Sequence, residues 1–189
     1  MAMKKELRAA LEAVLTEQVP TVLGEQYIRL KRLPKGKEYA IYPGEVVYAD
    51  TSRPTLGRFI CFIPSQKHNA FFIELGWSVD GRFPATSTRG IKSPEEVTSE
   101  APSRGFVRLT EFYSRLGEHW EVEPMDVLDP DSFTRAMEFA MRKLDPQEAL
   151  ALIRPLAEDA IRKVQQHAPG FFDALEERLR STGEGTVNR

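Results

Sequence analysis

The chain has 189 residues, of which 41% are hydrophobic and 29% are charged, and its acidic and basic side chains nearly cancel to a net charge of −2. This balance excludes an intrinsically disordered chain, a collagen-like fibre and a polybasic nucleic-acid coat protein. A chain of this length is one ordinary domain with its own core, so it needs neither disulfides nor a structural metal for stability.

The N-terminal segment is predicted to be a helix. Leu7, Leu11 and Leu15 recur at the spacing of one helical face, with Val14 beside them. Pro20 should end this helix, because its ring disfavours the α conformation for the residue before it.

From residue 27 to residue 77 the hydrophobic period changes to two. Ile28 and Leu30 alternate with Tyr27, Arg29 and Lys31, so we expect the aliphatic pair to face the core and the other three to face outward. Turn signals at 34–37 and 43–44 separate short apolar runs, which predicts an antiparallel β-meander of four to six strands. The run 59–63 is apolar on both faces, as in a strand that is buried on both sides.

Residues 86–105 are rich in turn-forming residues and predict a long, mobile loop. Within the loop, Ser93, Pro94 and Glu96 form a capping-box pattern that predicts a short helical turn. Residues 106–120 fit either a strand or a helical turn, and the acidic run that follows, from Glu118 to Asp131, is typical of a solvated connection.

The C-terminal part is predicted to be helical. One apolar stripe runs through residues 133–144, and a second helix should start at Pro146. Pro155 should kink or split this second helix, and Pro169 with Gly170 should break it before a last short helix. These patterns predict an α+β domain over residues 1–130, a C-terminal helical subdomain over 131–182 and a flexible tail over 183–189. The predicted core comprises Leu11, Leu15, Ile60, Phe62, Phe71, Ile73, Leu75, Trp77, Met137, Met141, Leu150, Ile153 and Ile161.

The residue pattern indicates no catalytic site, cofactor or metal. The three histidines, His68, His119 and His167, are isolated in sequence and lack the spacing of a metal-binding pair. Cys61 is the only thiol, and it lies in an apolar strand that disfavours the thiolate. A single cysteine, a charged N-terminus and the absence of a long apolar run favour a cytoplasmic protein without a membrane partner.

Basic and aromatic side chains are concentrated in one part of the predicted sheet. The candidate partner-binding residues are Tyr27, Arg29, Lys31, Lys35, Lys37 and Tyr39. Aromatic rings can stack on bases while basic groups meet phosphates, so this pattern is compatible with single-stranded nucleic acid. Tyrosine is also a common half-buried strand residue, and the charges can simply form the solvent-facing side of the sheet.

Two segments carry a resemblance to a known family. The segment 62–67, which reads FIPSQK, and the segment 71–76, which reads FFIELG, resemble a family of uncharacterised bacterial proteins that is described only as a domain of unknown function. The PGFF piece at 169–172 is also similar, whereas His68 stands where that family has serine. The resemblance implies a bacterial cytosolic α+β protein, an accessory or immunity-type partner, and it supplies no catalytic residues.

Three functional hypotheses follow from the sequence. The leading hypothesis is a non-enzymatic interaction protein that binds another macromolecule, either a protein partner or a second copy of the chain. The second is a weak single-stranded nucleic-acid binder that uses the basic aromatic face. The third is an enzyme whose site is assembled from distant loops and leaves no local motif.

Overall fold

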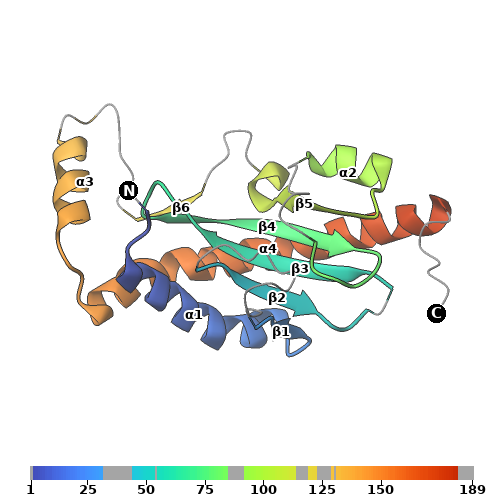
Figure 1. The fold of residues 1–189 in the computed structure, drawn as a ribbon, viewed down its shortest axis with the longest axis horizontal. Helices are drawn as coiled ribbons and strands as arrows, with labels where there is room; N and C mark the ends of the chain where they lie inside the picture. Colours follow the sequence, from blue (N-terminus) through green and yellow to red (C-terminus); the bar gives the residue numbers. More distant parts are fainter. Residues whose placement is uncertain are drawn as a thin grey trace, which may run out of the picture.

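The computed structural model describes residues 2–31, 44–53, 55–84, 92–113, 119–122, 129 and 131–182. The helices are α1 (Lys5–Leu23), α2 (Pro94–Glu100), α3 (Ser132–Met141) and α4 (Pro146–Thr182), and a 3₁₀ helix spans Leu109–Phe112. The strands are β1 (Tyr27–Arg29), β2 (Val46–Asp50), β3 (Gly57–Pro64), β4 (Ala70–Ser78), β5 (Arg104–Arg108) and β6 (Trp120–Glu121). The fold is α+β, with an N-terminal helix, an antiparallel sheet and a long C-terminal helix (Figure 1).

The sheet confirms the predicted antiparallel meander. Its strand order is β1-β2-β3-β4-β5, and β6 adds to the start of β4. The residue partners Phe62 and Ile73 lie in the centre of the β3–β4 pair, which is the longest pairing of the sheet. Consecutive strands lie side by side even where the connection is long, as between β4 and β5, whose connection contains α2.

One face of the sheet packs against α1 and α4. Ile60, Phe62, Ile73 and Leu75 point to this face and are fully buried, and they share one core cluster with Leu11 of α1 and Ile153 of α4. Figure 1 shows α4 running along the length of the sheet. Most predicted core residues are buried here, with Leu150 partly buried.

The opposite face of the sheet carries a smaller cluster of Val47, Phe59, Cys61, Ile63, Phe83 and Phe106. Strand β3 is therefore buried on both faces, as its continuous apolar run predicts. Cys61 is fully buried in this cluster, which fits a small hydrophobic side chain.

The helices tolerate the prolines better than the sequence predicts. Helix α1 continues past Pro20 to Leu23, and α4 is one helix of 37 residues with Pro155 and Pro169 inside it. The predicted break at 169–170 is wrong. Buried side chains recur on one face of α4 on both sides of each proline, and their burial outweighs the roughly 3 kcal/mol that an internal proline costs.

The segment 92–105 packs against the body of the protein. The capping box at Ser93 and Glu96 is present, and α2 buries Val97 completely. Ala101 is also fully buried, and the indole Nε1 of Trp77 donates a hydrogen bond to the Pro102 carbonyl at 2.9 Å. The predicted helical turn is confirmed, the expected long loop is wrong for this segment, and the rest of the prediction, residues 86–91, lies outside the described residues. The described part of the ambiguous stretch 106–120 forms the end of β5, the 3₁₀ helix and, at Trp120, the start of β6.

Helix α3 contradicts the predicted core. Met137 is 43% exposed and Met141 is 78% exposed. The helix touches the body through another side, on which Phe139 is buried. The spacing of Met137 and Met141 marks one face of a helix, but whether anything covers that face depends on how the helix is placed.

None of the described helices is both long enough and apolar enough to cross a bilayer. Helix α4 is long, but it carries many charged side chains. The proposed flexible tail at 183–189 lies outside the described residues.

Helices α1 and α4 and the sheet contribute to the same core cluster.

Candidate functional site

The predicted outward-facing row of Tyr27, Arg29 and Lys31 has the opposite orientation at Tyr27 and Ile28. Ile28 is 54% exposed, whereas Tyr27 is partly buried and packs against the main core. The expectation that Ile28 points to the core is therefore wrong. The reason is the pairing of β1 with β2, which places Tyr27 opposite Asp50 and Arg29 opposite Tyr48 on the face that carries α1.

Arg29 has a partner inside the protein, and Tyr27 is partly buried. Arg29 donates to Glu12 of α1 at 2.6 Å. Burial and the nearby Asp50 raise the pKa of the Tyr27 hydroxyl to about 12. Lys31 is exposed. Lys35, Lys37 and Tyr39 lie outside the described residues. Tyr27 and Arg29 are thus less available to a partner than the sequence suggests.

Replacing both Arg29 and Lys31 with alanine is expected to change the free energy of unfolding by less than about 1 kcal/mol, because exposed ion pairs and charges contribute little. Urea denaturation measures this. Fluorescence anisotropy with labelled single-stranded DNA and RNA at low salt tests the predicted binding role of the row. If the double variant binds nucleic acid as tightly as the wild type, Arg29 and Lys31 have no role in binding.

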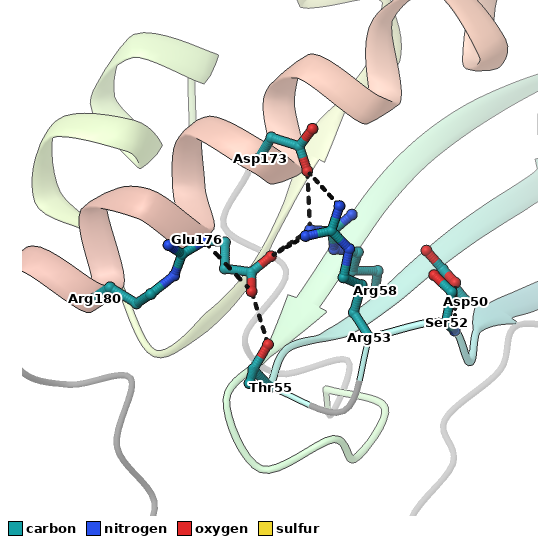
Figure 2. Close-up of polar contacts among 8 residues, drawn as sticks. All are labelled: Asp50, Ser52, Arg53, Thr55, Arg58, Asp173, Glu176 and Arg180. Carbon is teal, nitrogen blue, oxygen red and sulfur yellow. Dashed lines mark hydrogen bonds and ion pairs between the residues drawn. The ribbon is translucent and has the colours of Figure 1, made fainter.

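A buried ion pair joins β3 to the C-terminal half of α4 (Figure 2). Arg58 and Glu176 have side chains only 6% and 9% exposed, and Arg58 Nη2 donates to Glu176 Oε2 at 2.6 Å. Thr55 donates to the other oxygen of Glu176 at 2.8 Å, and Asp173 accepts from Arg58 at 3.2 Å. The guanidinium of Arg58 also lies 5.3 Å from the centre of the Phe172 ring.

This network has the character of a structural clamp. Two further arginines, Arg53 and Arg180, pair with the same acidic groups, so three arginines surround two carboxylates (Figure 2). Its contacts join residues more than 100 positions apart in sequence, and they fix α4 against the loop between β2 and β3.

The turn between β3 and β4, residues 65–69, is held at one end of the molecule by two distant segments. The amide of Met3 donates to the Ser65 carbonyl at 3.1 Å, and the amide of Lys4 donates to the side chain of Asn69 at 3.0 Å. On the other side, the amide of Val122 donates to the Asn69 carbonyl at 2.8 Å. The polar residues of this turn therefore sit on a fixed backbone.

Two histidines meet at this turn. The rings of His68 and His119 stack with their centres 6.2 Å apart. Both approach the carboxylate of Glu121 on β6, His119 Nε2 at 3.1 Å from Oε2 and His68 Nδ1 at 3.9 Å from Oε1. Across the described ranges, no group of three or more His, Cys, Asp or Glu is arranged to hold a metal ion.

Two hollows lie on either side of His68. The first, which we call the Arg108 hollow, has a volume of about 110 Å³ and is lined by Ser65, His68, Ala70, Phe72, Arg108 and His119. The second has a volume of about 140 Å³ and lies between the 65–69 turn and α3, where Phe133 and Met137 form part of its wall.

Helix α3 stands at the end of the molecule, away from the layer that α1 and α4 form (Figure 1). The ammonium of Lys4 caps its C-terminal end by donating to the carbonyls of Ala140 and Arg142 at 2.8 and 2.7 Å, where a positive charge also complements the helix dipole. The helix leaves an apolar ridge of Phe133, Met137 and Met141 exposed, Phe133 to 62%.

Comparisons with known proteins give no information about this site. No protein-family model matches the chain, and no curated protein or solved structure is significantly similar to it. The resemblance to a bacterial family of unknown function therefore stays a prediction.

The sequence analysis did not identify the residues that gather at this end. His68 and His119 are 51 positions apart, and only the pairing of β6 with the start of β4 brings them together. Their positions carried no local signal, because neither histidine lies at a helical or turn spacing from the other. The exposed apolar ridge did have a signal, the helical stripe, but the stripe predicts burial in the core, which is wrong for Met137 and Met141.

Proposed function

We propose that this protein is a non-enzymatic interaction protein that binds another macromolecule, a partner protein, through the apolar ridge of α3. The observation that carries the proposal is the exposure of Phe133, Met137 and Met141 on one side of a helix. Soluble proteins rarely leave large apolar side chains together in water, and such clusters commonly mark protein-binding surfaces.

The ridge suits a partner helix. Its three side chains are spaced four residues apart and extend over about 12 Å, slightly more than two helical turns. Methionine side chains adapt to the shape of a partner, and the hollow of about 140 Å³ beside the ridge offers a place for one apolar side chain. Glu138 is exposed on the flank of the ridge, so the partner we expect is an amphipathic helix with a basic side chain beside its apolar face.

The proposed setting follows the resemblance to bacterial proteins and the single cysteine. We place the protein in the bacterial cytoplasm, as an accessory or immunity-type protein. No observation on the described residues favours the nucleic-acid alternative, because Tyr27 is half-buried and Arg29 is paired with Glu12.

Met137→Asp and Met141→Asp are expected to abolish capture of the partner while leaving the free energy of unfolding within about 1 kcal/mol of the wild type, because both side chains are exposed. Tagged wild-type and variant proteins would be used to capture binding proteins from a lysate of the source cell, with quantification by mass spectrometry. Ile28→Asp is the matched control, since it places the same charge on another exposed aliphatic side chain, on β1.

The proposal requires one protein that the wild type and Ile28→Asp enrich and that both α3 variants lose. The same protein, once purified, should bind the wild type directly, and Glu138→Lys should weaken this binding. Equal capture by all variants, or capture that nuclease treatment removes, would contradict it.

A further inference from the structure

Within the part of the chain that the structure describes, Arg108 forms no ion pair with a carboxylate. It lies on β5 with its guanidinium 4.7 Å from the centre of the Phe72 ring. Its Nε is buried and has no hydrogen-bond acceptor among the described residues. Glu74 stands opposite in the strand register, yet no ion pair joins the two among the described residues, and Glu74 has an interaction of its own. A buried donor that lacks an acceptor commonly indicates an ion or water that completes the site.

Three further donors line the same hollow. Glu121 hydrogen-bonds to Nε2 of His119 at 3.1 Å and lies 3.9 Å from Nδ1 of His68, which leaves the other nitrogen of each ring for a ligand. When the rings are protonated, those nitrogens carry N–H groups. The hydroxyl oxygen of Ser65 accepts hydrogen bonds from the amides of Lys67 and His68, so its own hydrogen is available for donation.

We infer that the Arg108 hollow binds one tetrahedral oxyanion, a phosphate group, with Arg108 as the permanent charge and His68, His119 and Ser65 as further donors. The volume of about 110 Å³ is a few times the ~30 Å³ that a water molecule occupies in the liquid, which suits one phosphate group and excludes a whole nucleotide. The guanidinium group matches the geometry of phosphate oxygens.

Acidic groups also stand near the hollow without lining it. Glu121 on β6 contacts both imidazoles, and Glu74 stands opposite Arg108 in the strand register. The hollow shares His68 with the hollow beside α3 but contains none of the ridge residues.

The test follows the imidazole resonances by ¹H–¹⁵N NMR while inorganic phosphate is added at constant ionic strength at pH 6. His68 and His119 should shift and saturate, whereas His167, which stacks on Phe112 and Tyr113, serves as an internal control and should not. Sulfate, which has the same tetrahedral shape, should compete with phosphate for the same hollow. Methyl phosphate distinguishes two sources of the phosphate group. If it binds as tightly as inorganic phosphate, the site accepts the phosphate group of a larger molecule. If it does not bind, the site is specific for free phosphate.

Arg108→Gln should weaken phosphate binding about tenfold or more, because it removes a charge-assisted contact. Arg104→Gln changes an exposed arginine on the same strand and should bind like the wild type. Arg108→Lys keeps the charge and guards against a folding defect, and it should recover part of the affinity. The inference is overturned if phosphate produces no saturable shift, if all three histidines shift alike, or if Arg108→Gln binds as well as Arg104→Gln.

Discussion

Replacing Glu176 with leucine is expected to lower the free energy of unfolding by about 3–5 kcal/mol, which is typical for breaking a buried ion pair. The change leaves the guanidinium of Arg58 buried, with only the more exposed Asp173 as a close partner. It also removes the acceptor of the Thr55 hydroxyl. Urea denaturation followed by circular dichroism measures the loss.

Two further variants separate the charge effect from packing. The double variant Arg58→Leu with Glu176→Leu should be more stable than Glu176→Leu alone, because no uncompensated charge stays buried. Asp173→Asn should cost less than about 1 kcal/mol, since Asp173 is 56% exposed. A Glu176→Leu protein within 1 kcal/mol of the wild type would show that the ion pair does not hold α4 to the sheet.

The same clamp should make stability depend on acid. Burial alone would raise the pKa of the Glu176 carboxyl, but hydrogen bonds from Thr55 and Arg58 and the charges of Arg58 and Arg180 outweigh it and hold the pKa below its ordinary value of 4.5. A carboxyl with a lowered pKa stabilises the fold above its unfolded-state value, and this stabilisation is lost as the pH falls through the folded-state value. The difference in unfolding free energy between the wild type and Glu176→Gln should therefore be constant at neutral pH and shrink below about pH 4.5.

Trp77→Ala is expected to cost about 3–5 kcal/mol, as other large-to-small changes of buried tryptophan do. The ring is 1% exposed and meets Phe171 of α4 edge to face, with the ring centres 5.7 Å apart. Its hydrogen bond to Pro102 also holds the segment between α2 and β5. Loss of Trp77 should thus loosen the helix, the strand and the segment together, which hydrogen exchange of α2 and β5 would detect.

Gly105 provides the control for this prediction. A Cβ at Gly105 would lie 2.8 Å from atoms of the Trp77 ring, so Gly105→Ala alone should destabilise the protein by about 1–3 kcal/mol. In the Trp77→Ala background the ring is absent, and the same change should cost much less. If Gly105→Ala lowers the free energy of unfolding equally in both backgrounds, the contact with Trp77 is not the reason that glycine is needed at position 105.

Local patterns were sufficient for much of the fold. Alternation and turn residues predicted the antiparallel meander, and the capping box placed α2 at the correct residue, because both depend on neighbours in the chain. Helix ends at prolines were not predicted correctly. Burial along α4 outweighs the local cost of Pro155 and Pro169, and that burial is a property of the packed sheet.

The sequence by itself determined the α+β class, the antiparallel strands and the amphipathic stripe of α3, since each follows from the spacing of apolar and turn residues along the chain. Tertiary structure decided which side of each element is covered. It turned Tyr27 and Arg29 toward α1, left Met137 and Met141 in water, and brought His68 beside His119 through the pairing of β6 with β4. The physical reason is that a stripe or an alternation specifies two faces but not their surroundings, which depend on contacts between residues far apart in the chain.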